Sequence, residues 1–172
     1  ELTRLINRRA MLHLIELEHL RSLRSGRPLL LAQLDIDHFK PINDQHGHST
    51  GDRALQAFAG TVRANVRDTD VLARWGGEEF VLMLTDTSAD HARELLERIR
   101  QAVQALDIAH SAGSVQLTVS IGLAQHLPGY TVEHTLERAD QALYRAKALG
   151  RNRVVVAPAA HRTVAVGSNA RA

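Results

Sequence analysis

Apolar residues recur every three or four positions in four segments of the chain, which is the spacing of one buried face of a helix. The segments span residues 5–24, 54–66, 92–106 and 132–149. Gly26 follows the first segment in the position of a helix C-cap, and Ser88 precedes the third as a candidate N-cap. The pattern therefore predicts four helices that each bury one face.

Shorter apolar runs between these segments are typical of strands. Residues 29–36 form a run bounded by Pro28 and by polar residues, which suits a buried central strand. The runs 70–75 and 80–84 flank a Gly-Gly turn and predict a hairpin. Two further strands are expected at 115–124 and 152–156.

The polar stretch 37–51 contains Pro41, Asn43 and two glycines, and it predicts a loop with at most a short helical piece. From Pro158 onward the residues are small and polar, which is typical of a frayed tail. The predicted elements follow the order helix, strand, helix, hairpin, helix, strand, helix, strand. This order predicts an α/β or α+β fold, with helices packed on a mixed central sheet.

Composition narrows the class of protein. A chain of 172 residues with 44% apolar residues is long enough for one globular domain with a real core. The absence of cysteine excludes disulfides and cysteine-ligated zinc, and no apolar run is long enough to span a membrane, so a cytoplasmic domain without membrane contact is expected. The 21 Lys and Arg are scattered and nearly balanced by 19 Asp and Glu, which indicates a mixed solvated surface and no nucleic-acid partner.

Two acidic patches fall at the ends of predicted buried strands. Asp35 and Asp37 end the first strand, and Glu78 and Glu79 lie at the hairpin turn. Mg²⁺ binds one or two carboxylates together with substrate phosphates, so the patches favour a metal site. Solvated or helix-capping acids are the alternative for each residue taken singly.

Five short blocks occur in a fixed order along the chain. Residues 76–80 read Gly-Gly-Glu-Glu-Phe, and the others lie at 2–9, 35–52, 118–124 and 139–154. With these blocks the chain resembles GGDEF-domain diguanylate cyclases, in the common Glu variant of their signature. The resemblance implies a catalytic domain over residues 1–157, and the composition predicts a disordered tail over 158–172.

The family resemblance implies a mixed sheet flanked by helices, related to nucleotidyl cyclases and to the palm of polymerases. It implies a reaction that joins two GTP into cyclic di-GMP with loss of two pyrophosphates, and two Mg²⁺ or Mn²⁺ ions per active site. Asp35 and Glu78 match the catalytic metal-binding carboxylates, with the Ile36 carbonyl as a further ligand. Glu79 matches the other acid at the metal site, a candidate for helping to ionise the 3′-hydroxyl.

The resemblance also implies residues that hold GTP. Asn43 and Asp52 match the pair of residues that recognises guanine in the family. A carboxylate at Asp52 can accept hydrogen bonds from the N1–H and the 2-amino group of guanine, and adenine lacks both donors. Lys147 and Arg151 match the phosphate contacts, and they would share one helix face if the last helix reached that far. The remaining expected substrate-site residues are Phe39, which we expect to pack, Lys40, which would meet a phosphate or an acidic neighbour, and the turn residues Gly76 and Gly77.

Arg67 and Asp70 form an RxxD sequence at the same offset before the GGEEF turn as the inhibitory site of the family. The resemblance implies that cyclic di-GMP binds there and restrains the enzyme. Arg98 matches a second arginine that clamps a bound product dimer from a neighbouring domain. A surface salt bridge between Arg67 and Asp70 is the alternative.

Arg4 stands where the family usually has glycine, so it is expected to strain the turn or to change how the first helix enters. We also expect an upstream sensor or linker, through which a longer protein could be anchored to a membrane. Since each domain of the family holds one GTP, catalysis needs a homodimer. The alternative function is a catalytically silent receptor for GTP or cyclic di-GMP, although such receptors usually lose an acid that this chain keeps.

Overall fold

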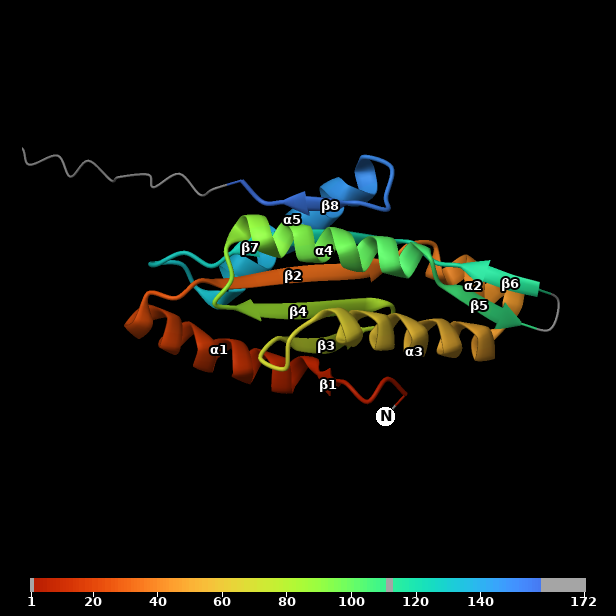
Figure 1. The fold of residues 1–172 in the computed structure, drawn as a ribbon, viewed down its shortest axis with the longest axis horizontal. Helices are drawn as coiled ribbons and strands as arrows, with labels where there is room; N and C mark the ends of the chain where they lie inside the picture. Colours follow the sequence, from red (N-terminus) through yellow and green to blue (C-terminus); the bar gives the residue numbers. More distant parts are fainter. Residues whose placement is uncertain (1, 111–112, 159–172) are drawn as a thin grey trace, which may run out of the picture.

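The computed structural model describes residues 2–110 and 113–158, and its centre is a six-stranded sheet with the order β1-β3-β4-β2-β7-β8 (Figure 1). The strands are β1 (Ile6–Asn7), β2 (Leu29–Ile36), β3 (Val71–Gly76), β4 (Glu79–Thr85), β7 (Val119–Gln125) and β8 (Val154–Val156). The two edge strands run parallel to their neighbours, whereas the inner pairs are antiparallel. The predicted mixed sheet is therefore confirmed.

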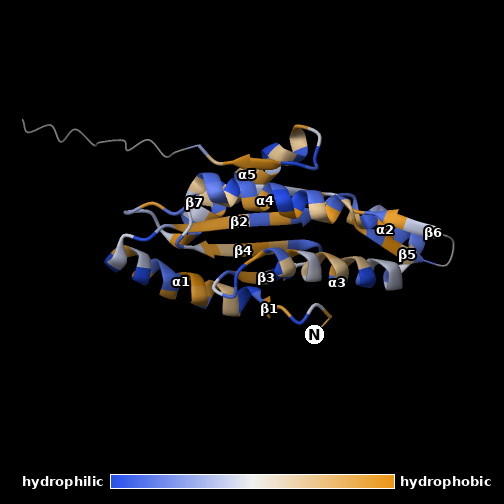
Figure 2. Ribbon diagram, viewed as in Figure 1, coloured by the Kyte–Doolittle hydropathy of each residue, from blue (hydrophilic) through white to orange (hydrophobic). Residues whose placement is uncertain are grey.

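Helices cover both faces of the sheet (Figure 1). They are α1 (Arg8–Ser25), α2 (Phe39–His46), α3 (His48–Asn65), α4 (Ala89–Gln104) and α5 (Val132–Ala148). Successive residues of β2 point to opposite faces, so Leu30 and Leu34 pack with α3 and α4, while Leu29 and Leu31 pack with α1 and α5. Figure 2 accordingly shows β2 as mostly hydrophobic along its length, as expected of a central strand buried on both faces.

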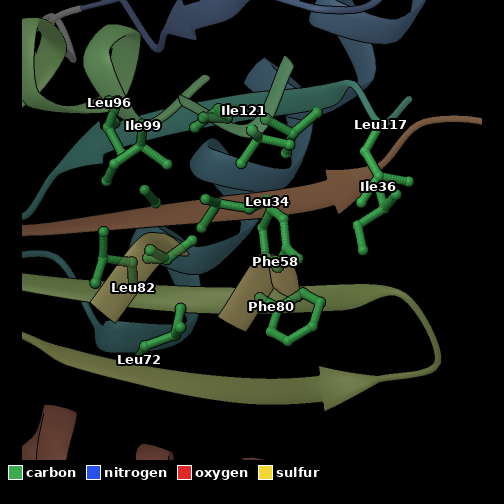
Figure 3. Packing of buried hydrophobic residues seen from close by; sticks show 14 of the residues in the cluster. Leu34, Ile36, Phe58, Leu72, Phe80, Leu82, Leu96, Ile99, Leu117 and Ile121 are labelled. Atoms are coloured by element: carbon green, nitrogen blue, oxygen red, sulfur yellow. The ribbon is translucent and has the colours of Figure 1, made fainter. Parts of the chain in front are cut away.

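The larger core cluster fills the space between the sheet and α3 and α4 (Figure 3). The rings of Phe58 on α3 and Phe80 on β4 lie 4.6 Å apart between centroids. Leu96 and Ile99 of α4 belong to the same cluster and are fully buried. This core fixes β2 and β4 side by side, and the ends of those two strands carry the acidic patches.

Several local predictions are confirmed. The central strand has the predicted bounds of residues 29–36. The predicted hairpin is present, but its turn is Gly77–Glu78, because Gly76 ends β3 and pairs with Glu79. Gly26 takes the left-handed conformation of a C-cap, with φ of 70°, and the Ser88 side chain accepts a bond from the His91 backbone N–H at 3.3 Å. These features depend on single residues and their neighbours, which a sequence shows directly.

The prediction that residues 37–51 form mostly a loop is wrong. Phe39–His46 form α2, and α3 begins at His48. Pro41 lies in the first turn of α2, where its missing N–H costs no helical hydrogen bond. Gly47, with φ of 80°, separates the two helices, so the polar stretch is a helix–glycine–helix unit.

The expected strand at 115–124 is also wrong as a single element. A separate hairpin of β5 (Asp107–His110) and β6 (Gly113–Gln116) precedes β7, which begins at Val119. The first helix begins at Arg8 because Asn7 caps it, accepting a bond from the Ala10 N–H at 3.0 Å. The short strand β1, Ile6–Asn7, directly precedes this helix.

Arg4 has a φ of 53°, in the left-handed region that favours glycine. The expected backbone strain at this position is therefore present. No described helix carries an apolar stretch long enough to cross a lipid bilayer. Of the predicted tail, only Pro158 belongs to the described residues.

Candidate active site

Strand pairing brings the two acidic patches together at one end of the sheet. Asp35, next to last in β2, is paired in register with Glu79, the first residue of β4. The Ile36 N–H donates to the Glu78 carbonyl oxygen at 3.3 Å. The carboxylates of the two patches thus extend from adjoining strand ends, and the register of a single antiparallel pair places them there.

The Asp35 carboxyl group is buried, with 7% of the residue exposed. Burial raises its pKa above the usual value, and the nearby Glu78 and Glu79 raise it further. Lys147 opposes these effects, because its Nζ lies 2.8 Å from Asp35 Oδ2. Lys147 is therefore the neighbour that favours the charged form of this buried carboxyl group.

The donor set fits a hard divalent cation. Asp35 is buried, Glu78 is half-buried and Glu79 is exposed, so the site offers carboxylate oxygens that range from the interior to the surface. Within the described part of the chain, no three His, Asp or Glu side chains are grouped so as to enclose an ion by themselves. This arrangement suits Mg²⁺, which keeps waters and takes substrate phosphates to complete its shell.

The residues expected to read guanine lie on two adjoining helices. Asn43 is in the last turn of α2 and Asp52 is in the second turn of α3, where it is exposed. A Cβ on Gly51 would lie 1.9 Å from Asn43 Oδ1, so the Asn43 side chain occupies space that only a glycine leaves open. The α2–α3 unit that was predicted as a loop therefore positions both residues.

Phe39 and Lys40 lie at the start of α2 but face different surroundings. Phe39 is 7% exposed and belongs to the core, where it supports the α2–α3 contact. The Lys40 ammonium pairs with Asp44 one helical turn later, with 2.8 Å between Nζ and Oδ2. Phe39 thus packs, and Lys40 has the acidic neighbour that was one of its two expected partners.

Lys147 and Arg151 do not share a helix face, because α5 ends at Ala148. Arg151 lies in the following loop with a φ of 63°. Lys147 reaches the Asp35 carboxylate, while the Arg151 side chain is exposed. The two cations therefore come from different elements, and Lys147 is the one that contacts the acidic patch.

Gly76, the last residue of β3, and Gly77, in the hairpin turn, border the acidic patches. Gly77 has a φ of 46°, and its carbonyl accepts a bond from Arg74 Nε at 2.9 Å, which closes the turn. A Cβ at either glycine would meet no atom within 4 Å. The turn therefore presents bare backbone to open space beside the carboxylates.

Comparison with known proteins assigns this arrangement to a family. Residues 1–153 match the profile described as "Diguanylate cyclase, GGDEF domain". The chain belongs to the GGDEF domain family of diguanylate cyclases. It is 47% identical over 156 residues to diguanylate cyclase DgcP of Pseudomonas aeruginosa and 44% identical over 156 residues to DgcM of Escherichia coli. Both alignments cover 91% of this chain but only 23% and 37% of those proteins, so the chain spans less than two fifths of the length of these relatives.

A solved GGDEF domain has the same fold. The GGDEF domain of DgcB from Caulobacter crescentus, in complex with c-di-GMP, superposes with a TM-score of 0.88 at 36% identity. The match covers 91% of this chain and 94% of that one. The mixed α+β fold expected from the resemblance is thereby confirmed.

The GGDEF domain has a second polar surface at the α3–β3 connection. Arg67, Asp70 and Arg98 line one hollow of about 280 Å³ there. Asp70 accepts a bond from the Arg67 backbone N–H at 3.0 Å, and Arg98 donates to the Asn65 carbonyl at 3.0 Å. The structure therefore gathers the three residues expected at an inhibitory site, and Asp70 closes a turn instead of an ion pair with the Arg67 side chain.

Sequence reasoning missed one buried acid of the GGDEF domain. Asp37 was grouped with Asp35 but given no role of its own, yet it is only 3% exposed and accepts bonds from three different residues. Its partners lie 81 or more positions away along the chain, so only the fold reveals them. One signal was present in the sequence, because Asp37 directly follows β2 and lies two residues beyond Asp35.

Proposed function

We propose that this domain is a diguanylate cyclase that condenses two GTP into cyclic di-GMP and releases two pyrophosphates. The observation that carries the proposal is the in-register pairing of Asp35 with Glu79, with Lys147 bound to Asp35 at 2.8 Å. Carboxylates and a cation at one strand end are the groups that nucleotidyl transfer needs. The names of the relatives support the same reaction.

We propose that the site holds two metal ions, either Mg²⁺ or Mn²⁺. Their protein ligands would be the Asp35 and Glu78 carboxylates and the Ile36 carbonyl oxygen. When bound, such ions lower the pKa of the attacking 3′-hydroxyl and neutralise the leaving pyrophosphate. In this proposal Glu79, which is exposed at the start of β4, helps to ionise that hydroxyl by accepting its proton. Asp35 and Glu78 thus bind the metal ions in this proposal, and Glu79 transfers the proton.

Lys147 and Arg151 hold the triphosphate in this proposal. Lys147 pairs with Asp35, the carboxylate that a metal would take, so its ammonium lies next to the phosphate position. Arg151 adds a second donor from the loop after α5. Two cations suit a triphosphate because charge-assisted hydrogen bonds are about twice as strong as neutral ones.

Asn43 and Asp52 read the base. An ionised Asp52 accepts from the N1–H and 2-amino group of guanine, whereas adenine would leave the carboxylate without a donor. The bare backbone of Gly76 and Gly77 lets the nucleotide approach the strand end. Asn43 is held for this role by its fit against Gly51.

The reaction requires two copies of the domain, each with one GTP, because the product has twofold symmetry. We further propose that cyclic di-GMP binds at Arg67, Asp70 and Arg98 and slows the enzyme, since these residues line one hollow. GTP is a cytoplasmic nucleotide, so the proposed reaction belongs in the cytoplasm.

The test is to incubate the purified domain with GTP and Mg²⁺ at several protein concentrations and to separate the nucleotides. Cyclic di-GMP and pyrophosphate are expected, with a rate per domain that rises with protein concentration. Binding of GTP or cyclic di-GMP without any turnover at the highest concentration would establish the receptor alternative and overturn the cyclase.

A further inference from the structure

The loop that carries Arg151 has an unusual backbone. Gly150, Arg151 and Asn152 have φ values of 110°, 63° and 45°, so three consecutive residues take left-handed conformations. Residues with a side chain rarely adopt this region and do so where surrounding contacts hold them. The contacts that hold this loop therefore determine the position of the Arg151 Cα atom and the direction in which its side chain leaves the backbone.

Asp37 is the first such contact. It lies two residues beyond Asp35, and its Oδ2 accepts a bond from the Asn152 backbone N–H at 3.0 Å. The hydroxyl groups of Thr118 and Ser120 donate to the same carboxylate at 2.8 and 2.7 Å. Asp37 thus ties the loop to the end of β2, close to Asp35.

The Asn152 side chain is the second contact. Its Oδ1 accepts from Arg100 Nη1 on α4 at 2.8 Å, and its Nδ2 donates to Gln104 Oε1 at 3.2 Å. Arg100 is itself held by Glu97, with 2.6 Å between Nη2 and Oε1. Asn152 is therefore fixed from β2 through its backbone and from α4 through its side chain.

Arg151 lies between these anchors and α5. Its backbone N–H donates to the Ala146 carbonyl at 3.0 Å, and its own carbonyl accepts from Arg153 Nε at 3.0 Å. The backbone is fixed on both sides of the residue, while the side chain is exposed. Such an arrangement fixes the position of the Arg151 backbone and leaves its guanidinium group available to bind a ligand.

We propose that Asp37 and Asn152 are positioning residues that aim Arg151 at the triphosphate of GTP. The inference rests on the proposed function, since it assumes that Arg151 contacts phosphate. Preorganisation of this kind lowers the cost of binding because the loop is ordered before the nucleotide arrives. Asp37 then contributes to nucleotide affinity only through Arg151.

A double-mutant cycle tests this dependence. Affinity for α,β-methylene GTP with Mg²⁺ is measured by calorimetry for the wild-type domain, Asp37→Asn, Arg151→Ala and the double variant. Asp37→Asn is expected to weaken binding about tenfold alone, as for loss of one charge-assisted contact, and to have almost no further effect beside Arg151→Ala. Equal losses in both backgrounds would overturn the inference, because Asp37 would then act on the fold in general.

Asn152→Gly gives an independent arm, since glycine tolerates the backbone conformation and loses only the side-chain bonds. It is expected to weaken binding and to speed hydrogen exchange of the amides at residues 150–153. Thr131→Ala, which removes the N-cap at the far end of α5, is the matched control and should lower stability without changing affinity.

The arms separate failure of the inference from failure of the proposed function. A wild-type domain that does not bind the GTP analogue would overturn the cyclase and, with it, the role of Arg151. A wild-type domain that binds it, with Asp37→Asn and Asn152→Gly binding equally well, would overturn the positioning role alone.

Discussion

Asp35 is buried, with 7% of the residue exposed, yet its carboxyl group must be ionised to bind a cation. A carboxyl group whose pKa is higher in the folded state than in the unfolded chain favours folding at low pH, and that contribution is lost as pH rises through the folded value. At neutral pH the charged group therefore lowers the free energy of unfolding. The residue is retained at a cost in stability that its proposed chemistry explains.

Asp35→Asn is accordingly predicted to abolish turnover and to raise the melting temperature of the metal-free domain at pH 7. Each kcal/mol gained shifts the midpoint by about 2–4 °C for a domain of this size. The measurements are a cyclase assay and thermal unfolding in a chelator. Turnover with Mg²⁺ at the wild-type rate would contradict the metal-binding role, and a lower melting temperature would contradict the electrostatic account.

Asp52→Ala is predicted to weaken GTP binding and to narrow the difference in affinity between GTP and ATP. The carboxylate is exposed on α3, so its removal should not disturb the core. Calorimetric titration with both nucleotides measures the effect, and Asp140→Ala, at an exposed position of α5, is the control. An unchanged preference would show that Asp52 does not read the base.

At the scale of elements, sequence predicted best where one residue or one periodic face decides the structure. The strand at residues 29–36 and the caps at Gly26 and Ser88 are such cases. Residues 37–51 were mispredicted because their polar residues signal a loop, whereas packing of Phe39 and Ile42 on the core makes a helix. In this segment the local polarity favours a loop, whereas burial of two apolar side chains favours a helix, and the structure is helical.

The same contrast holds for the candidate site. The acidic patches at Asp35 and Glu78 were visible from their places at strand ends, and the family motif supplied the remaining residues. The partners of Asp37 were not predictable, because hydrogen bonds over long separations depend on register and loop conformation. The end of α5 before Arg151 likewise depends on contacts of the following loop.

Gly122 of β7 shows how closely α5 lies on the sheet. A Cβ there would fall 2.1 Å from the Ala139 carbonyl oxygen and 2.2 Å from the Leu143 nitrogen, which are backbone atoms. Gly122→Ala is predicted to lower the free energy of unfolding by at least about 1–3 kcal/mol. Gly60→Ala on α3 has nothing within 4 Å and should be neutral or slightly stabilising in the same denaturant titration. Equal stability of the two variants would contradict this packing.

Arg67→Ala is predicted to weaken inhibition by cyclic di-GMP roughly ten- to a hundredfold, since a charge-assisted contact contributes about 1.5–3 kcal/mol. Initial velocity should stay nearly unchanged because the catalytic acids lie elsewhere. Progress curves with added cyclic di-GMP measure the effect. Arg24→Ala, on α1 and outside the hollow, is the control. Superimposable curves for wild type and Arg67→Ala would place any inhibition elsewhere.

At the scale of the whole molecule, a chain of hydrogen bonds joins α1 to the rest of the domain. His19 on α1 contacts buried His126 with 2.7 Å between Nδ1 and Nε2, and His126 Nδ1 lies 2.7 Å from Thr135 Oγ1 on α5. The Thr135 hydroxyl donates to the Thr131 carbonyl, so His126 donates through Nδ1 and accepts through Nε2. All these hydrogen bonds form when the His126 ring is neutral, because its Nε2 must then accept.

Burial lowers the pKa of His126, with smaller effects from His19 and Arg138. A histidine with a lowered folded pKa stabilises the fold above its unfolded value, about 6.5, and stability is lost as pH falls below it. The free energy of unfolding of the wild-type domain is predicted to decrease from pH 7.5 to pH 5.5. Over this range its decrease per pH unit should exceed that of His126→Gln by up to about 1.4 kcal/mol. Exposed His13→Gln should keep the wild-type slope, and the same slope in His126→Gln would contradict the prediction.

The outer strands of the sheet are short: β1 has 2 residues and β8 has 3. A long bare edge strand would offer its unpaired amides to any neighbouring sheet and so promote aggregation. Each edge here presents too few backbone groups to template such growth. The proposed reaction demands that copies of the domain be crowded together, and these blunted edges let them collide often without joining into fibres.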